Sequence, residues 1–252
     1  MFKHELNKIR YSILQSCFKI KEGHIGSAFS VIEILYVIFK RYFKKHYFIL
    51  SKGHAAIGVY AVMNHFKILN NKDYKSFCKL NSRLGGHPDS TKIPGVEAST
   101  GSLGHGFPTA IGVALGLKIK KKSNRIFALL GDGECHEGTI WESANIGANQ
   151  QLGNLCAIVD WNQSAAQLMP VDDLPGKWES FGWEISVIDG HSQSELESFF
   201  SNLDFDIHSK PKVLLAKNIK GKGVSIIEGH GAWHHKIPND EEFEIIKKEL
   251  SF

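Results

Sequence analysis

The sequence predicts an α/β fold, a doubly wound and mostly parallel β-sheet with helices on both faces. Short, mostly apolar segments end at turns, as expected of strands that are buried on both sides. Segments with apolar residues at helical spacing lie between them, which favours parallel pairing through crossover helices. The length of 252 residues, with 42% hydrophobic content, suits a single domain over residues 1–252 with a substantial core.

Five segments have the character of buried strands. The second of them, Arg125–Leu130, is largely apolar and runs straight into a Gly-Asp-Gly turn. The order of the strands in the sheet stays open, because one sequence does not determine it. The predicted strands are 48–50, 125–130, 155–159, 183–188 and 213–216.

Helical spacing of apolar residues predicts the elements around these strands. Residues 84–106 are too rich in glycine and proline for regular structure and form a long loop of the kind that often carries function. A polar tail follows Pro238. The predicted helices are 6–20, 31–39, 55–66, 107–120 and 138–151.

The charge distribution argues against a nucleic-acid partner. The formal net charge is +4 and the pI about 8.7. The lysines responsible are scattered, and no basic stripe is interleaved with aromatic residues. A mildly basic surface would also suit phosphorylated substrates, but a solvated lysine face explains it equally well.

The four cysteines and the N-terminal segment indicate a cytoplasmic protein without a membrane anchor. Cys17, Cys78, Cys135 and Cys156 form no C-x-x-C pair and have no histidines at zinc spacing, which favours reduced thiols. No apolar leader opens the chain, and the longest apolar stretch, around 31–39, is interrupted by Glu33.

Polar residues follow two of the predicted strands. In Gly131-Asp132-Gly133 the glycines permit a tight turn and close approach of a phosphate to backbone amides, and Asp132 offers a hard oxygen to Mg²⁺. At the end of the next strand, the Asn162 amide oxygen and the Ser164 carbonyl could bind the same ion. Ligands of open α/β sheets bind beyond the carboxyl ends of the strands, so the two ends together predict a diphosphate clamp.

The spacing gives this pattern its meaning, because a lone Gly-Asp-Gly is most often just a turn. The 27 residues between Gly133 and Trp161 suffice for one helix and one strand, which bring two strand ends together. The arrangement resembles the thiamine diphosphate motif, in which Gly-Asp-Gly is followed at this distance by Asn-Asn. Here Trp161 replaces the first asparagine, and Asn162 keeps the position that supplies the metal ligand.

The resemblance extends over nearly the whole chain and identifies it as similar to the transketolases. The Trp-His-His-Lys-x-Pro segment near the end resembles the Trp-His-x-Lys-x-Pro of small split transketolases in particular. The other segments match Gly-His-Pro-Gly, Leu-Ser-x-Gly-His-Ala, Gly-His-Pro and Pro-Gly-Val-Glu-x-x-Thr-Gly-x-Leu-Gly-Gln-Gly. The matching segments are 23–26, 50–55, 86–88, 94–106 and 233–238.

The resemblance implies the thiamine diphosphate-binding fold, as its diphosphate-type domain, with thiamine diphosphate and Mg²⁺ as cofactors. It implies metal ligation by Asp132, Asn162 and the Ser164 carbonyl, and contact of the Gly133 amide with the diphosphate. Further cofactor contacts are implied for His54, Gly101, Ser102, Leu103, Glu137 and His234.

The resemblance also implies the residues that handle protons. His24 and His87 match histidines that act on sugar hydroxyls and carbonyl, and His234 matches one near the reacting carbon. Imidazole suits this work because its ordinary pKa of about 6.5 lies near neutral pH. His235 adjoins His234, so a register slip of one would exchange their roles. Glu137 matches a dimer-interface glutamate that communicates with the catalytic acid of the partner, or it is an ordinary carboxylate at a helix start.

One loop departs from the family pattern. Gln163–Gln167 is small and polar, where transketolases usually carry a Ser-Ile-Asp-Gly-like continuation or a lysine-containing variant. A backbone metal ligand tolerates this change, whereas the preference for donor or acceptor sugars could differ.

The expected function is transfer of a two-carbon ketol unit from a ketose to an aldose, with sugars or sugar phosphates as substrates. The pyrimidine-binding and C-terminal domains of a complete transketolase do not fit within 252 residues. We therefore expect them on a separately encoded C-terminal subunit, in an α2β2 heterotetramer, and little activity without that partner. The sequence leaves the particular sugars and the pathway open.

Several alternatives remain at this stage. Within the same class, a deoxyxylulose phosphate synthase or a 2-oxoacid dehydrogenase component is possible, although the Gly-His-x-Gly and Trp-His segments argue against the dehydrogenase. A non-catalytic scaffold subunit would keep the fold and the partner surface. A nucleotide-binding protein would lack its usual Walker lysine or Gly-x-Gly-x-x-Gly turn here.

Overall fold

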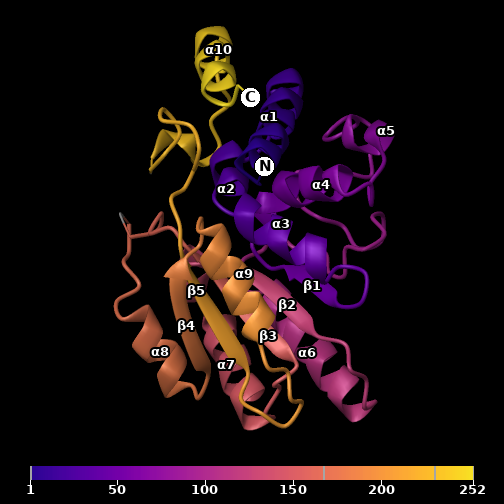
Figure 1. The fold of residues 1–252 in the computed structure, drawn as a ribbon, viewed down its shortest axis with the longest axis vertical. Coiled ribbons are helices and arrows are strands. Elements are labelled where there is room, and N and C mark those ends of the chain that lie inside the picture. The colour runs from indigo at the N-terminus through magenta and orange to yellow at the C-terminus, as the bar shows by residue number, and fades with distance from the viewer. Residues whose placement is uncertain (1, 167, 230, 252) are drawn as a thin grey trace.

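The computed structural model, which describes residues 2–166, 168–229 and 231–251, has a five-stranded parallel β-sheet (Figure 1). The strand order is β1-β2-β3-β5-β4, so β5 lies between β3 and β4. The predicted α/β class and parallel sheet are confirmed. The strands are β1 Tyr47–Leu50, β2 Ile126–Gly131, β3 Leu155–Trp161, β4 Glu184–Asp189 and β5 Lys212–Lys217.

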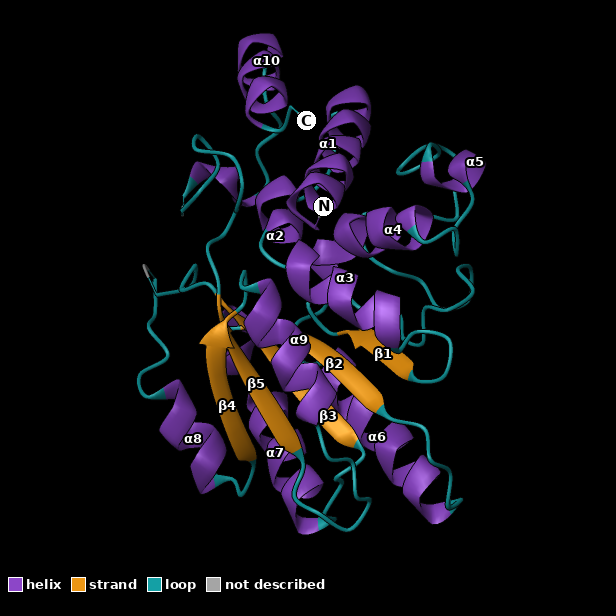
Figure 2. Cartoon of the chain, viewed as in Figure 1, coloured by secondary structure: helices purple, strands orange, loops and turns teal. Residues whose placement is uncertain are grey.

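Helices cover both faces of the sheet (Figure 2), as predicted. In the view shown, α9 crosses the near face and α6 and α7 lie behind. The helices are α1 Phe2–Ile20, α2 Ile25–Phe29, α3 Ile32–Arg41, α4 Ala56–His65, α5 Asn71–Tyr74, α6 Gly106–Ile119, α7 Gly138–Asn149, α8 Leu174–Ser180, α9 Gln193–Asn202 and α10 Asp240–Glu249. Short 3-10 turns are η1 Gly53–Ala55, η2 Gly133–His136 and η3 Ala232–His234.

Alternate residues of the central strands enter two separate cores. Phe127 and Leu129 of β2 pack with α1–α4, α9 and α10, whereas Ala128 and Leu130 pack with α6–α8. Successive side chains of a strand point to opposite faces, so a strand buried on both sides must be apolar throughout. This explains why β2 is apolar along its whole length.

The structure has a helix, α2, between the two helices that the sequence predicts at the start of the chain, and it differs from the sequence expectation at two further places. The sequence predicts a buried strand at 183–188, but β4 is an edge strand whose residues are exposed or half-buried. The expected polar tail after Pro238 forms helix α10, which begins with a capping box between Asn239 and Glu242. α10 packs beside α1, where the Phe18 and Phe243 rings lie 4.3 Å apart.

The register of the sheet brings three strand ends together. Gly131 of β2 is opposite Asp160 of β3, and Asp160 is opposite Ala216 of β5. The Gly-Asp-Gly turn and the Trp161-Asn162 turn therefore lie side by side at the carboxyl edge. None of the helices in the described part of the chain is long and apolar enough to cross a membrane.

Candidate active site at the carboxyl edge of the sheet

A cavity of about 380 Å³ lies beyond the carboxyl ends of β1, β2 and β3. Predicted site residues line it together with several residues that the sequence did not single out. The lining is Ser27, Lys52, His54, Leu103, Gly131, Asp132, Gly133, Glu134, Asn162, Ser164, Ala165, Leu168, Lys220 and His234.

Asp132 is placed by the turn that follows β2. Its side chain accepts a hydrogen bond from the Gly133 amide (2.8 Å), and its own amide donates to the Asp160 carbonyl (3.2 Å). The residue is only 6% exposed. Burial, and secondarily the nearby Asp160 carboxylate, raise the pKa of Asp132. A cation bound at this carboxylate would offset both effects.

Asn162 presents an amide oxygen to the same cavity. Its Nδ2 donates to Asp160 Oδ2 (2.8 Å), and its Oδ1 accepts from the Ser164 amide (2.9 Å). Ser164 Oγ in turn accepts from Lys220 Nζ (2.7 Å). The carboxylate, amide and backbone oxygens around this point are the donors that Mg²⁺ prefers.

The oxygen donors fit a cation that shares its coordination with a bound diphosphate. Within residues 2–166, 168–229 and 231–251, no group of three His, Cys, Asp or Glu side chains could hold a metal ion. Mg²⁺ is commonly held by one or two carboxylates together with substrate phosphates. A buried hydroxyl of the lining, Ser27 Oγ, also has no hydrogen-bond partner in the described chain, as expected where a ligand completes the site.

Two buried lysines give the cavity a positive wall. Lys52, at the end of β1, pairs with Asp160, and Lys220 donates to Ser164 and to His234 Nδ1 (2.8 Å). Burial, followed by repulsion from Lys52, lowers the pKa of Lys220 to about 8. An anion such as a diphosphate would be stabilised against this wall.

A cluster of five histidine rings adjoins the cavity. Ring centroids of His24 lie 5.6 Å from His54, 6.1 Å from His87, 5.5 Å from His234 and 4.4 Å from His235. His54 and His234 lie 5.5 Å apart. The sequence-predicted histidines are therefore brought together from segments that are far apart in the chain.

Three histidines of this cluster, His24, His54 and His234, favour the neutral form. Burial, followed by the neighbouring histidines, lowers the pKa of His24 to about 4. Burial, followed by Lys52, lowers the pKa of His54 well below its usual value, and burial and Lys220 lower that of His234. Neutral imidazoles can both accept and donate protons at pH 7.

The structure separates the two adjacent histidines. His234 lines the cavity and accepts from Lys220 through Nδ1, so its proton resides on Nε2. His235 instead contacts Glu22 through Nε2 at 2.7 Å. His234 is thus the one that faces the cavity.

The loop 101–103 lies against η1. Gly101 has φ +147°, and a Cβ there would lie 3.0 Å from the His87 ring. A Cβ on Gly53 would lie 2.7 Å from the Gly101 amide nitrogen, so both positions require glycine. Leu103 lines the cavity, whereas Gly101 and the exposed Ser102 do not.

Three further predicted positions lie outside the cavity lining. His24 and exposed His87 join the histidine cluster without lining the cavity. Glu137 is exposed at the start of α7. Its side chain lies against Gly104, because a Cβ added at Gly104 would lie 2.7 Å from Glu137 Cβ. The predicted role of Glu137 concerns a contact with a partner subunit and therefore stays a prediction.

Sequence reasoning missed four charged residues at this edge. Glu134 is buried and accepts from the Gly104 amide (3.0 Å) and the Gly131 amide (3.2 Å). Burial raises its pKa. The other three charged residues that the sequence did not single out are Lys52, Asp160 and Lys220. For Lys52 and Asp160, the signal in the sequence is a charged residue within or just after an apolar strand, because burying a charge is costly unless it is paired.

The unusual loop after Asn162 forms the outer rim. Gln163 has φ +57°, and Leu168 is 94% exposed although it contributes to the cavity lining. Ala165 lies over the glycine turn, because a Cβ on Gly133 would approach its Cβ to 3.1 Å. Gln167, the last residue of the predicted departure, lies outside the described residues.

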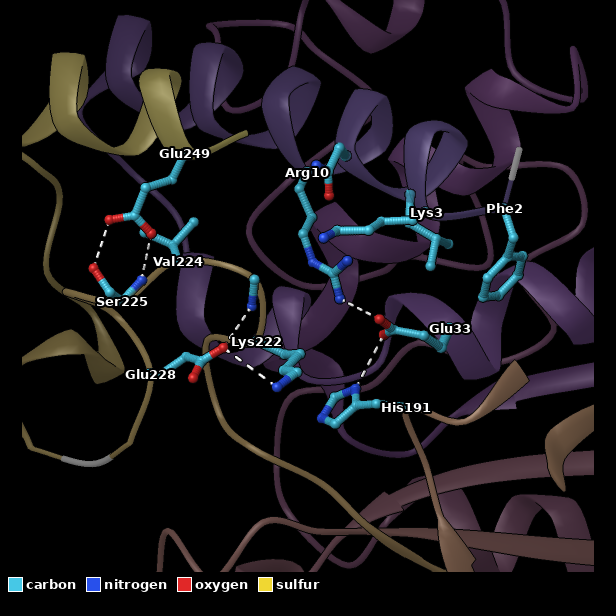
Figure 3. Close-up of a pocket in the computed structure, with 13 residues that line it drawn as sticks. Phe2, Lys3, Arg10, Glu33, His191, Lys222, Val224, Ser225, Glu228 and Glu249 are labelled. Carbon is cyan, nitrogen blue, oxygen red and sulfur yellow. Dashed lines mark hydrogen bonds and ion pairs between the residues drawn. The ribbon is translucent and has the colours of Figure 1, made fainter. Parts of the chain in front are cut away.

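A larger cavity, about 610 Å³, lies between α1, α3, the loop after β4 and the segment 222–228 (Figure 3). Its buried charges are paired within the chain: Arg10 donates to Glu33 Oε1 (2.6 Å), and His191 Nδ1 lies 3.3 Å from Glu33 Oε2. His191 Nε2 accepts from the Ile219 amide (2.8 Å). This set connects α1 and α3 with the loop after β4, and the described residues form no metal-binding group of His, Cys, Asp or Glu here.

Fold and site together define a class: an α/β protein whose carboxyl sheet edge carries oxygen donors, a positive wall and a histidine cluster. A family model described as transketolase, thiamine diphosphate binding domain, matches residues 2–252. The chain therefore belongs to the transketolase family, through its thiamine diphosphate-binding domain.

Individual relatives agree with this assignment. The chain is 31% identical to an apulose-4-phosphate transketolase subunit of Phocaeicola vulgatus, covering 97% of this chain and 92% of that protein. It is 31% identical to the 6-deoxy-6-sulfo-D-fructose transketolase subunit of a Clostridium species, covering 98% and 95%. A transketolase structure from Pichia stipitis has the same fold, with a TM-score of 0.90 at 23% identity over 99% of this chain and 40% of that one.

Proposed function

We propose that this chain is the thiamine diphosphate-binding subunit of a transketolase that transfers a two-carbon ketol unit from a ketose to an aldose. The observation that carries the proposal is the meeting of Asp132, Asn162 and His234 around one cavity at the strand ends. Bound thiamine diphosphate supplies the nucleophilic carbon and the electron sink for this chemistry.

The proposed cofactor contacts divide between the ion and the organic group. Asp132, Asn162 and the Ser164 carbonyl would hold Mg²⁺. The Gly133 amide would contact the diphosphate, with Lys52 and Lys220 opposite its charge. The rest of the cofactor would lie against His54, Gly101, Ser102 and Leu103.

The proposed proton transfers use the histidine cluster. His24 and His87 would exchange protons with the sugar hydroxyls and carbonyl, and His234 would act near the reacting carbon. His234 suits this role because Lys220 holds its Nδ1, which leaves Nε2–H toward the cavity. Glu137 would communicate across a subunit interface.

A separately encoded partner completes the proposal. Two relatives of nearly this length are named as subunits of transketolases, which implies a second chain in each of those enzymes. We propose a C-terminal subunit that carries the pyrimidine-binding domain, in a cytoplasmic α2β2 assembly with the cofactor at the interface. The names of the relatives point to phosphorylated or sulfonated sugars as the substrate class.

Reconstitution tests the proposed activity. The chain, its partner subunit, thiamine diphosphate and Mg²⁺ should together transfer a ketol unit with at least one ketose and aldose from a panel of sugar phosphates, sulfonated sugars and nucleotide sugars. Absence of transfer across the whole panel would reject the activity. Release of carbon dioxide from pyruvate would instead favour another thiamine diphosphate enzyme.

The variant Asp132→Ala separates an enzyme subunit from a scaffold. It should abolish transfer in the reconstituted complex, because the cation loses its carboxylate ligand, while Asp172→Ala, an exposed carboxylate of the neighbouring loop, should retain it. A scaffold would support the partner equally well with either variant.

A further inference from the structure

A single carboxylate lies at the centre of the polar groups behind the cavity. Asp160, near the end of β3, has no exposed surface. Its Oδ1 accepts from Ser30 Oγ (2.7 Å) and Asn218 Nδ2 (2.6 Å). Its Oδ2 accepts from Lys52 Nζ and Asn162 Nδ2 (2.8 Å). Both oxygens are therefore fully used, by donors from four separate segments of the chain.

This carboxylate determines which way the Asn162 amide faces. An ionised carboxylate only accepts hydrogen bonds, so the amide NH₂ must point toward Asp160. The same NH₂ lies 3.3 Å from Ser30 Oγ, whose hydrogen is donated to Asp160. The amide oxygen consequently points the other way, toward the cavity and the Ser164 amide. An oxygen can bind a hard cation, whereas an NH₂ group cannot.

The same carboxylate also holds one of the two lysines of the positive wall. Lys52 is 2% exposed, and its ammonium contacts Asp160 Oδ2 at the cavity lining. A buried ammonium needs such a partner to remain charged. Asp160 thus contacts the amide and the ammonium on the two sides of the site without lining the cavity itself.

We propose that Asp160 is a positioning residue: it fixes the Asn162 amide with its oxygen toward the cation and anchors the Lys52 ammonium beside the diphosphate. The inference rests on the proposed function, because that function makes Asn162 a metal ligand. Groups that orient metal ligands commonly change metal affinity 10- to 100-fold when they are replaced.

The substitution Asp160→Asn tests this role because it preserves size. One carboxylate oxygen becomes an NH₂ group, which must then face two hydrogen-bond donors on one side of the residue or the other. With saturating thiamine diphosphate, we expect the Mg²⁺ affinity of the full chain, measured by calorimetry, to fall at least about tenfold.

A double-mutant cycle distinguishes positioning from general support of the fold. If Asp160 acts through Asn162, then Asp160→Asn should weaken Mg²⁺ binding by a smaller factor in the Asn162→Ala background than in the wild-type chain, because only the loss of the Lys52 anchor remains there. A merely structural role would weaken binding by the same factor in both backgrounds, and that result would overturn the inference.

Asn218→Ala provides the matched control. It removes a donor from the other oxygen, Oδ1, and leaves the contact between Oδ2 and Asn162 in place. We expect Mg²⁺ affinity to stay within about threefold of wild type, with circular dichroism confirming that each variant is folded. A loss in Asn218→Ala equal to that in Asp160→Asn would argue against a specific effect on Asn162.

Hydrogen exchange of the Asn162 side-chain amide, followed by NMR without metal or cofactor, tests the orientation itself. The amide should be protected in the wild-type chain and exchange at least about tenfold faster in Asp160→Asn. Equal protection, or equal Mg²⁺ affinity, in the two chains would overturn the inference and leave the proposed function intact. If the wild-type chain bound no Mg²⁺, the proposed function would fail, and the exchange measurement would still decide whether Asp160 orients Asn162.

Discussion

His24 illustrates how the surroundings of one side chain set its chemistry. Its ring is surrounded by four other histidines, and its Nδ1 is buried with no hydrogen-bond partner among the described residues. Desolvation and these neighbours both disfavour the imidazolium. A histidine that is reliably neutral can exchange protons with a sugar hydroxyl without first losing a proton to solvent.

The pKa of His24 gives a pH prediction. The unfolded chain binds a proton at this residue near pH 6.5, whereas the folded chain binds it near pH 4. The unfolded state therefore holds more protons between these values, and stability contributed by His24 is full above pH 6.5 and falls as the pH drops toward 4. An NMR titration should place the His24 midpoint near 4; a midpoint near 6.5 would contradict the structure.

The same linkage should appear in stability measurements. His24→Asn should flatten the decline of unfolding free energy between pH 6.5 and 4 by on the order of 1 kcal/mol, after allowance for solvent screening of this half-buried group. His208→Asn, at an exposed position, should leave the slope unchanged. Urea denaturation at several pH values measures both.

We predict that Gly53 cannot be replaced by any other residue without loss of stability. A Cβ would lie 2.7 Å from the Gly101 amide nitrogen, and backbone cannot move aside as a flexible side chain can. Gly53→Ala should cost about 1–3 kcal/mol of stability and weaken thiamine diphosphate binding by displacing the 101–103 loop. Gly112→Ala in α6, where nothing lies within 4 Å, should be neutral or stabilising by up to about 1 kcal/mol. Equal effects of the two substitutions in urea denaturation would refute this explanation.

At the scale of elements, the position of the site is determined by where the strands end, and the helices pack against the strands on both faces of the sheet. The site requires that β2, β3 and β5 end at the same edge, which their parallel register ensures. The turns after β2 and β3 then position Asp132 and Asn162 without any long loop of their own. Sites supported by strand ends are more precise than sites on loops alone.

Helix α10 depends on its N-terminal cap. Asn239 accepts from the Glu242 amide (2.8 Å), and the Glu242 side chain accepts from the Asn239 amide (3.0 Å). Asn239→Ala should therefore cost about 1 kcal/mol, while Asn239→Asp, which keeps a capping oxygen, should recover most of it. Thermal denaturation measures the difference, and an unchanged midpoint in Asn239→Ala would show that the cap contributes nothing.

Elements with a clear pattern of apolar residues could be predicted from the sequence, and elements with a weak pattern could not. Buried strands such as β2, and β3 up to Val159, are apolar on both faces, so sequence alone locates them. The position of the edge strand β4 is predicted within one residue, but its exposure depends on β5 lying between β3 and β4, which is a long-range pairing. Helix α10 is not predicted, because only Ile246 and, one turn later, Leu250 are fully buried, which leaves a weak apolar pattern. Its capping box is nevertheless visible in the sequence.

At the scale of the whole molecule, sequence motifs locate the site but not the charges behind it. Asp132, Asn162 and the histidines occupy positions that the motifs specify. Asp160, Lys52 and Lys220 stand beside such positions, where the motifs specify no residue, and their role depends on burial and on contacts that arise only when distant segments meet. Motifs therefore predict the groups that touch a cofactor better than the groups that orient them.

Two features of the chain as a whole explain why we expect a partner subunit. Its cavity opens beside an exposed rim at Leu168, and two relatives of nearly this length are named as transketolase subunits. In the proposed assembly, the second subunit would cover this rim.

Binding of thiamine diphosphate by calorimetry, with Mg²⁺ and with EDTA, tests the central claim most directly. We predict that the wild-type chain binds thiamine diphosphate in a Mg²⁺-dependent manner and prefers it to ATP. Asp132→Ala should lose at least about tenfold in affinity, a loss of about 1.4 kcal/mol or more, while Asp172→Ala binds normally. Binding that is independent of Mg²⁺, equal for ATP, or unchanged in Asp132→Ala would contradict a diphosphate site between the ends of β2 and β3.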